Sequence, residues 1–152
     1  MNKITSADIK LRLLQYFRFK RSMLCGTEVY CGPNISDVIA IDPIKKISYD
    51  IEVKVNYYDF SMDFKKVKHK SMELGLSDIN YFYFAVTKEL YDKIVNEVPD
   101  YCGLIIINGE ITIMRRGKKF KVLDSCFDKL YKNLILRINN QLITELERNQ
   151  DE

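Results

Sequence analysis

The sequence is poor in residues that bind zinc. Its only histidine is His69, and its four cysteines, at positions 25, 31, 102 and 126, form no Cys-x-x-Cys pair. Structural zinc sites use four closely spaced cysteine and histidine ligands, so this spacing argues against such a site. Unpaired cysteines fit a reduced, cytoplasmic environment, in which they serve as small buried hydrophobic residues.

Long apolar runs, low-complexity segments and internal repeats are absent as well. A helix that crosses a bilayer needs about 20 consecutive apolar residues, and no run approaches that length. Residues 1–5 lack the basic and then apolar pattern of a signal peptide. A chain of 152 residues is large enough to bury one core. We therefore expect one intracellular domain, residues 1–152, that does not bind a membrane.

The composition is that of a folded protein with a nearly balanced charge. Hydrophobic residues make up 47% and charged residues 30% of the chain, which excludes a disordered protein. The net charge of +3 is too small to identify a partner. The distribution is more informative, because lysines gather in the middle of the chain while residues 145–152 are mostly acidic.

Two short runs rich in isoleucine and valine, 36–42 and 47–55, predict a β-hairpin. Side chains alternate along a strand, so Glu52 and Lys54 share a face, and Asp37 lies at the start of the preceding strand. Two carboxylates bind a hard divalent cation, the cation activates a water, and a lysine stabilises charge on a phosphate. This combination suits metal-assisted phosphodiester hydrolysis. The alternative is a solvated strand face with cross-strand charge pairs.

The order of these residues resembles the PD-(D/E)XK nuclease superfamily, in which an acid is followed, across a hairpin, by (D/E)-x-K on a central strand. Residues 52–69 read Glu-Val-Lys-x4-Asp-Phe-x2-Asp-x2-Lys-x2-His, which is similar to the signature of MmcB-like DNA-repair proteins and related phage proteins. Residues 80–86 and 101–105 resemble the next two strands of that family. The resemblance extends over residues 27–115.

This resemblance implies a three-layer, restriction-endonuclease-like α/β fold with a mixed central sheet flanked by helices. It implies a Mg²⁺- or Mn²⁺-dependent deoxyribonuclease of DNA repair, recombination or phage DNA metabolism. Under this hypothesis Asp37 and Glu52 bind the metal, Val53 adds its backbone carbonyl, and Lys54 orients the attacking water. Glu28 would bind a second metal or hold a water, and it could equally be a surface residue of its strand.

A basic segment follows the candidate metal strand. A helix is expected from Asp59 to Gly75, with a buried apolar stripe at spacings of three and four. Outside that stripe lies a dense basic group, which consists of Lys65, Lys66, Lys68, His69 and Lys70. We expect this group to contact the phosphates of DNA. A solvated lysine face is the alternative.

The remaining elements follow from their periodicity and end signals. We expect a helix over 6–19 capped by Ser6, a strand over 24–30, a central aromatic strand over 78–86, a helix over 88–98, a hairpin over 103–115 that turns at Asn108-Gly109, and a long last helix capped by Asp124. The last helix would pack on the sheet or pair two subunits in a homodimer.

Two other functions fit the same residues. The first is a non-cleaving DNA-binding repair-accessory module with the nuclease fold, which need not bind metal. The second is a protein-interaction subunit whose charged face meets an acidic partner. The trio of Asp37, Glu52 and Lys54 ranks catalysis first. The sequence leaves open whether the substrate is DNA or RNA, single-stranded, duplex or branched, and whether it is cut internally or from an end.

Overall fold

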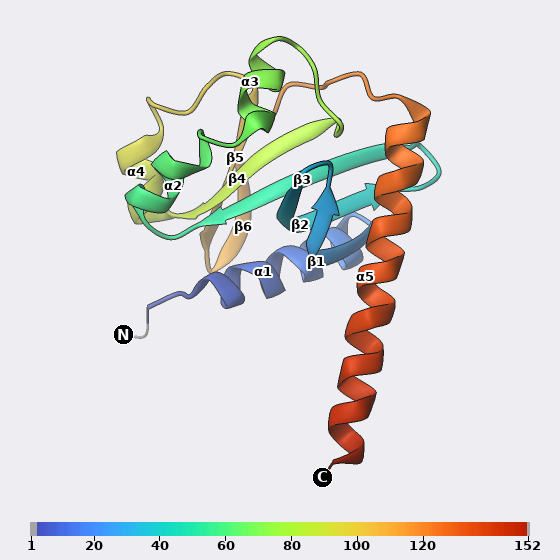
Figure 1. Ribbon diagram of the computed structural model, residues 1–152. Coiled ribbons are helices and arrows are strands. Elements are labelled where there is room, and N and C mark those ends of the chain that lie inside the picture. Colours follow the sequence, from blue (N-terminus) through green and yellow to red (C-terminus); the bar gives the residue numbers. More distant parts are fainter. Residues whose placement is uncertain (1–2, 152) are drawn as a thin grey trace.

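Six strands form a mixed sheet in the order β1-β2-β3-β4-β5-β6 in the computed structural model, which describes residues 3–151 (Figure 1). The strands are β1 (Leu24–Cys31), β2 (Asn34–Asp42), β3 (Ile47–Lys54), β4 (Tyr81–Thr87), β5 (Cys102–Asn108) and β6 (Glu110–Arg115). The pairs β3–β4 and β4–β5 are parallel, and the other three pairs are antiparallel. Apolar runs, alternation and turn signals in the sequence predicted each of these strands.

Helices cover both faces of the sheet, which confirms the predicted three-layer α/β fold. One face carries α1 (Ser6–Gln15) and the short π-helix η1 (Tyr16–Lys20). The other face carries α2 (Tyr57–Asp63), α3 (Val67–Glu73), α4 (Lys88–Ile94) and α5 (Asp124–Gln150). Within residues 3–151, no helix combines the length and the apolar composition needed to cross a membrane.

Strand β4 lies between the two apolar cores. Phe82 and Phe84 point toward α2, α3 and α5, whereas Tyr83 and Ala85 point toward α1. Strands that are covered on both faces read as continuous hydrophobic runs, and the aromatic sequence of β4 therefore predicted its central place correctly. The four cysteines all lie in the described part of the chain and carry free thiols.

The helix expected from Asp59 to Gly75 is in fact two helices, α2 and α3. Lys66 stands between them with an extended backbone, at φ −69° and ψ 141°, and interrupts the helical hydrogen bonds. The first helix also begins earlier than expected. Its N-cap is Asn56, whose side chain accepts a hydrogen bond from the Asp59 N–H over 2.9 Å. An apolar stripe with helical spacing does not reveal a break of this kind, because both pieces keep the same period.

The caps of the first and last helices also differ from expectation by one residue. Thr5, rather than Ser6, caps α1 in a capping box with Asp8: the Thr5 N–H donates to the Asp8 carboxylate over 3.0 Å, and the Asp8 N–H donates to Thr5 Oγ1 over 3.2 Å. Helix α5 begins at Asp124, but its N-cap is Leu123, which offers no side-chain hydrogen bond.

At Gly103 strand β5 packs so closely on its neighbours that no side chain fits. A Cβ atom at this position would collide with the Tyr83 ring and would lie 2.7 Å from the backbone nitrogen of Gly117. Overpacking a core costs about 1–3 kcal/mol, and we expect Gly103→Ala to lose about 3 kcal/mol because backbone cannot move aside easily. Urea unfolding measures this loss. The control Thr112→Ala, on exposed β6 surface, should change stability by less than about 0.5 kcal/mol, and equal effects would contradict the packing described here.

Candidate functional site

Asp37 links β2 to the predicted metal strand. Its neighbour Val38 pairs with Ile51, so Asp37 reaches β3 just beyond the last paired residues. The Val53 N–H donates to Asp37 Oδ2 over 2.8 Å. In an extended strand the N–H and C=O of one residue point to the same side, so the Val53 carbonyl lies along the edge that Asp37 covers. Two of the predicted oxygen ligands, Asp37 and Val53, are thus neighbours.

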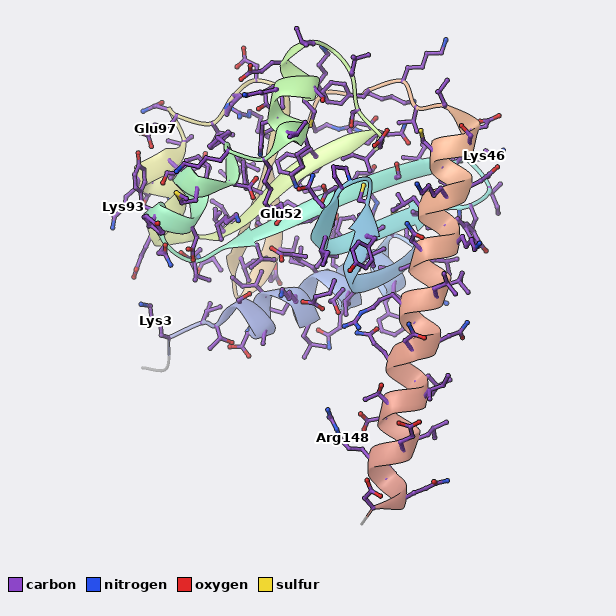
Figure 2. All side chains as sticks on the ribbon, in the orientation of Figure 1. Lys3, Lys46, Glu52, Lys93, Glu97 and Arg148 are labelled. Carbon is purple, nitrogen blue, oxygen red and sulfur yellow. The ribbon has the colours of Figure 1, made fainter. Side chains whose placement is uncertain are left out.

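Glu52 lies under α3 and is almost completely buried, with 1% of its surface exposed (Figure 2). Lys68 Nζ is 2.8 Å and Lys66 Nζ is 3.6 Å from Glu52 Oε1. Burial raises the pKa of Glu52, Lys68 opposes that rise, and the nearby Asp37 carboxylate adds to it. We expected this side of β3 to face water or DNA, but α3 covers it.

Asp50, two residues earlier on β3, shares the same cation. Lys68 Nζ lies 3.3 Å from Asp50 Oδ2, and its ammonium also lies 4.6 Å from the centre of the Phe82 ring. Burial raises the pKa of Asp50 to about 6, although Lys68 acts in the opposite direction. Burial likewise disfavours the charged form of Lys68, but the two carboxylates outweigh it and raise the pKa of this lysine. Lys68 is therefore a permanent internal cation.

Asp63, at the end of α2, is the centre of a second group of charges. Lys54 Nζ is 3.0 Å and Lys66 Nζ is 2.8 Å from Asp63 Oδ1. His69 Nε2 is 2.6 Å from Asp63 Oδ2. The pKa of Asp63 lies well below its ordinary value, because the His69 hydrogen bond and the lysines overcome the opposing effect of burial. The carboxylate therefore stays ionised and can anchor Lys54.

His69 is a core residue with 1% of its surface exposed. Its ring packs against Phe64 and Phe84. An ionised Asp63 can only accept, so His69 Nε2–H donates to it, and His69 Nδ1 lies 2.8 Å from the Tyr101 hydroxyl oxygen. This burial does not fit the expected contact between His69 and phosphate.

The predicted basic group is divided by the fold. Lys65 and Lys70 are exposed, whereas Lys66 and Lys68 turn inward and bind the acids of β3 and α2. Lys65 and Lys70 are available to the solvent without rearrangement, and the side chain of Lys66 is 32% exposed. The expected positive surface is accordingly smaller than the sequence suggested, and two of its lysines act first as counterions of buried carboxylates.

A surface hollow of about 300 Å³ lies where these elements meet. Its walls come from α1, β2, β3, α2 and the α2–α3 break, and its lining residues are Ser6, Asp37, Val53, Lys54, Asp59, Met62, Asp63 and Lys66. It combines an acid from β2 with the lysine of the Glu-x-Lys pattern. A phosphate-sized group in this hollow would lie among Lys54, Lys66 and the Asp37 carboxylate.

Glu28 approaches the same region from β1. Lys10 of α1 connects the two acids, because its Nζ lies 2.7 Å from Glu28 Oε1 and 3.9 Å from Asp37 Oδ1. Arg137 of α5 lies 3.6 Å from Glu28 Oε2. The Glu28 backbone is in the left-handed region, with φ +50°, which costs about 1–2 kcal/mol in a residue with a side chain. Neither Lys10 nor Arg137 was expected in the site, because only long-range packing brings them there.

The oxygen donors fit a hard divalent cation in chemical type. Among the residues that the structure describes, Asp37 Oδ1 has only the distant Lys10 ammonium as a partner, at 3.9 Å, and is free to coordinate. Glu52 must first exchange its lysine partners. Within residues 3–151, no three acidic, histidine or cysteine side chains already stand together as a metal-binding group. The site could therefore hold a metal only after Glu52 separates from Lys66 and Lys68.

Removing the Asp63 carboxylate should destabilise the protein strongly. In Asp63→Ala, Lys54, Lys66 and His69 lose their shared acceptor inside the protein, and breaking a buried pair costs about 3–5 kcal/mol. Urea unfolding at pH 7 measures the effect. The matched control is Asp92→Ala, which removes an ion pair of 2.7 Å with Lys88 where the carboxylate side chain is 60% exposed, and should cost less than about 1 kcal/mol. Similar losses in both variants would show that the Asp63 group is not stabilising.

The lowered pKa of the Asp63 carboxylate predicts how the stability of the protein changes with pH. Its pKa in the folded protein lies below the ordinary value of 3.8, so its contribution to stability is complete above that pH and is lost as pH falls through the lower, folded-state pKa. We expect the stability difference between wild type and Asp63→Asn to be constant above about pH 5 and to narrow in stronger acid. Urea titrations at each pH measure it, and a difference that widens in acid would refute the assignment.

Comparison with known proteins gives one informative match. No protein-family model and no curated protein sequence matches this chain. The chain is similar in structure to the SPO1766 protein of unknown function from Silicibacter pomeroyi, with a TM-score of 0.79, 98% of this chain and 96% of that chain covered, and 16% sequence identity. At this identity the likeness establishes the three-layer α/β fold and leaves the activity to be argued from the site.

Proposed function

We propose that this protein is a divalent-metal-dependent nuclease that hydrolyses DNA phosphodiester bonds in repair, recombination or phage DNA metabolism. One observation carries the proposal: the 2.8 Å hydrogen bond from the Val53 N–H to Asp37 joins the β2 acid to the Glu52-Val53-Lys54 segment beside a surface hollow. An acid and a Glu-x-Lys pattern on paired strands of a three-layer fold are what the resemblance to PD-(D/E)XK nucleases implies. The proposed setting is the cytoplasm of a bacterium or of a phage-infected cell.

In this proposal Asp37, Glu52 and the Val53 carbonyl hold Mg²⁺ or Mn²⁺. The bound metal would supply an activated water and positive charge beside the scissile phosphate. Lys54 projects into the hollow and orients the attacking water, while Asp63 holds the Lys54 ammonium in place over 3.0 Å. Asp63 is a positioning residue, since it acts through Lys54.

In this proposal Lys66 exchanges its carboxylate partners for a phosphate when DNA binds. Lys66 contacts both Glu52 and Asp63 and is only partly exposed. A phosphate in the hollow competes with these acids for the Lys66 ammonium and so removes one of the two lysine partners of Glu52, and the metal must then displace Lys68. Lys65 and Lys70 face the solvent and would contact neighbouring phosphates. The left-handed backbone of Glu28 supports a functional role beside Asp37, because strained residues cluster at such sites.

The decisive experiment is a nuclease assay on labelled linear, circular and branched DNA, with Mg²⁺, Mn²⁺ or EDTA. We expect metal-dependent cleavage by the wild type and a loss of at least about 100-fold in Asp37→Asn and in Lys54→Ala, because each removes a group that acts on the reacting centre. The matched control is Asp59→Asn, an acid that lines the same hollow but is neither a proposed metal ligand nor part of the Glu52-x-Lys54 pattern, which should keep its activity. Cleavage that survives both site changes would refute the assignments.

A non-cleaving DNA-binding accessory module is the second candidate. It is favoured by the lysine partners of Glu52, which leave no assembled metal-binding group within residues 3–151. Calorimetric titration with Mn²⁺ separates the two candidates independently of activity. A nuclease should bind Mn²⁺ in a manner that Asp37→Asn weakens, whereas the accessory module should bind DNA with a steep salt dependence and without metal.

A further inference from the structure

Helix α5 is anchored to the sheet over about its first two thirds only. Leu134 packs on Gly26 of β1, and Arg137 Nε donates to the Thr27 carbonyl over 3.0 Å. The last anchoring contact along the helix is from Gln141 Nε2 to Thr27 Oγ1, over 3.2 Å. Beyond it the helix extends past the rest of the molecule (Figure 1), and Arg148 lies on this projecting part (Figure 2).

Helix α5 carries an apolar stripe that the rest of the described chain leaves partly exposed: Ile135 and Ile138 lie beside β1, and Leu142 and Leu146 lie on the projecting part. The α5 stripe consists of Ile135, Ile138, Leu142 and Leu146, at spacings of three, four and four, flanked by Leu136 and Ile143. Each of these residues is between 37% and 56% exposed. A helix that exposes an apolar stripe at this spacing is typical of helix–helix pairing, because only a second helix buries the stripe along its length.

We propose that the α5 stripe binds the α5 stripe of a second copy of this chain, in an antiparallel homodimer. The charges of the helix favour this partner and this orientation. Residues 128–137 carry three basic side chains and one acidic side chain, and residues 144–151 carry three acidic side chains and one basic side chain. An antiparallel pair sets the basic segment of each copy against the acidic segment of the other. A parallel pair would set like charges together, which is unfavourable.

The shape of the molecule favours the same orientation. The sheet and the other helices lie on one side of α5 up to its last anchoring contact at Gln141, and the rest of the helix projects freely (Figure 1). Antiparallel pairing puts the two bodies at opposite ends of the helix pair, where they do not compete for space. None of the residues that line the hollow at Asp37 and Lys54 belongs to α5. The dimer therefore leaves the proposed active site open, and it stands independently of the proposed function.

Sedimentation equilibrium of the whole protein over a range of concentrations tests the dimer. We expect the wild type to be dimeric at micromolar concentration, and Leu142→Lys with Leu146→Lys to raise the dissociation constant at least about 100-fold while the chain stays folded. The control is Ile44→Lys, at a residue 93% exposed on the β2–β3 turn, which should remain dimeric. A monomeric wild type, or a dimer that the stripe variant preserves, would overturn the proposal.

A charge exchange tests the orientation at low salt. Replacing Lys129 and Lys132 with glutamate should weaken the dimer about tenfold, as should replacing Glu145 and Glu147 with lysine, because each change sets like charges together. The chain that carries all four replacements should recover the wild-type affinity. Full affinity in both double variants would contradict antiparallel pairing. In a parallel dimer each segment faces its own copy, so both the original and the reversed charges set like against like and the affinity would not change.

Discussion

Burial of the charged side of β3 is the constraint on which the site depends. Removing a carboxylate from water costs several kcal/mol unless a cation accompanies it. Lys68 accompanies both Asp50 and Glu52, at 3.3 and 2.8 Å. Helix α3 is thereby held over the sheet by ion pairs as well as by apolar packing. Asp50 and Glu52 of β3 and Lys68 of α3 are buried together, because neither the acids nor the lysine could be buried without the opposite charge.

The break between α2 and α3 makes this arrangement possible. Asp63 and His69 are six residues apart, and in one continuous helix residues at that spacing differ by about 240° around the axis. Their side chains would then diverge, yet they meet over 2.6 Å. The extended backbone of Lys66 supplies the change of direction. As a result Asp63 can bind His69 on one oxygen and two lysines on the other.

Patterns within short segments of the sequence predicted the strands and the hairpin turns, which depend mainly on neighbouring residues. The alternation in 47–55 and the Asn108-Gly109 turn were sufficient for β3 and the β5–β6 hairpin, and a hairpin necessarily brings Asp37 near Glu52. Side-chain direction after a helix break is a different matter, because it depends on what the backbone packs against. The basic group was therefore expected on the surface, although Lys66, Lys68 and His69 turn inward.

Long-range contacts were beyond the reach of sequence patterns for the same reason. In the sequence, Lys10 cannot be distinguished from a solvated lysine of an amphipathic helix. Arg137 likewise cannot be distinguished from a surface residue of a long helix. Each reaches Glu28 only because α1 covers one face of the sheet while α5 packs on β1. The left-handed backbone of Glu28 is equally invisible in the sequence, because nothing local to that strand requires it.

The pairing of charges bears directly on the proposed reaction. Asp37, Glu52 and Asp63 each have a lysine nearby, at 3.9, 2.8 and 2.8 Å. A divalent cation entering alone would compete with these lysines and leave some of them unpaired, and a phosphate entering alone would leave acids unpaired. Either outcome is costly where the groups are buried. When both enter together, the acids can take the metal and the lysines can take the phosphate with little change in local charge. The proposed nuclease therefore couples metal binding to DNA binding. An accessory module that binds no metal would instead contact DNA through lysines that are not paired with buried acids, such as Lys65 and Lys70.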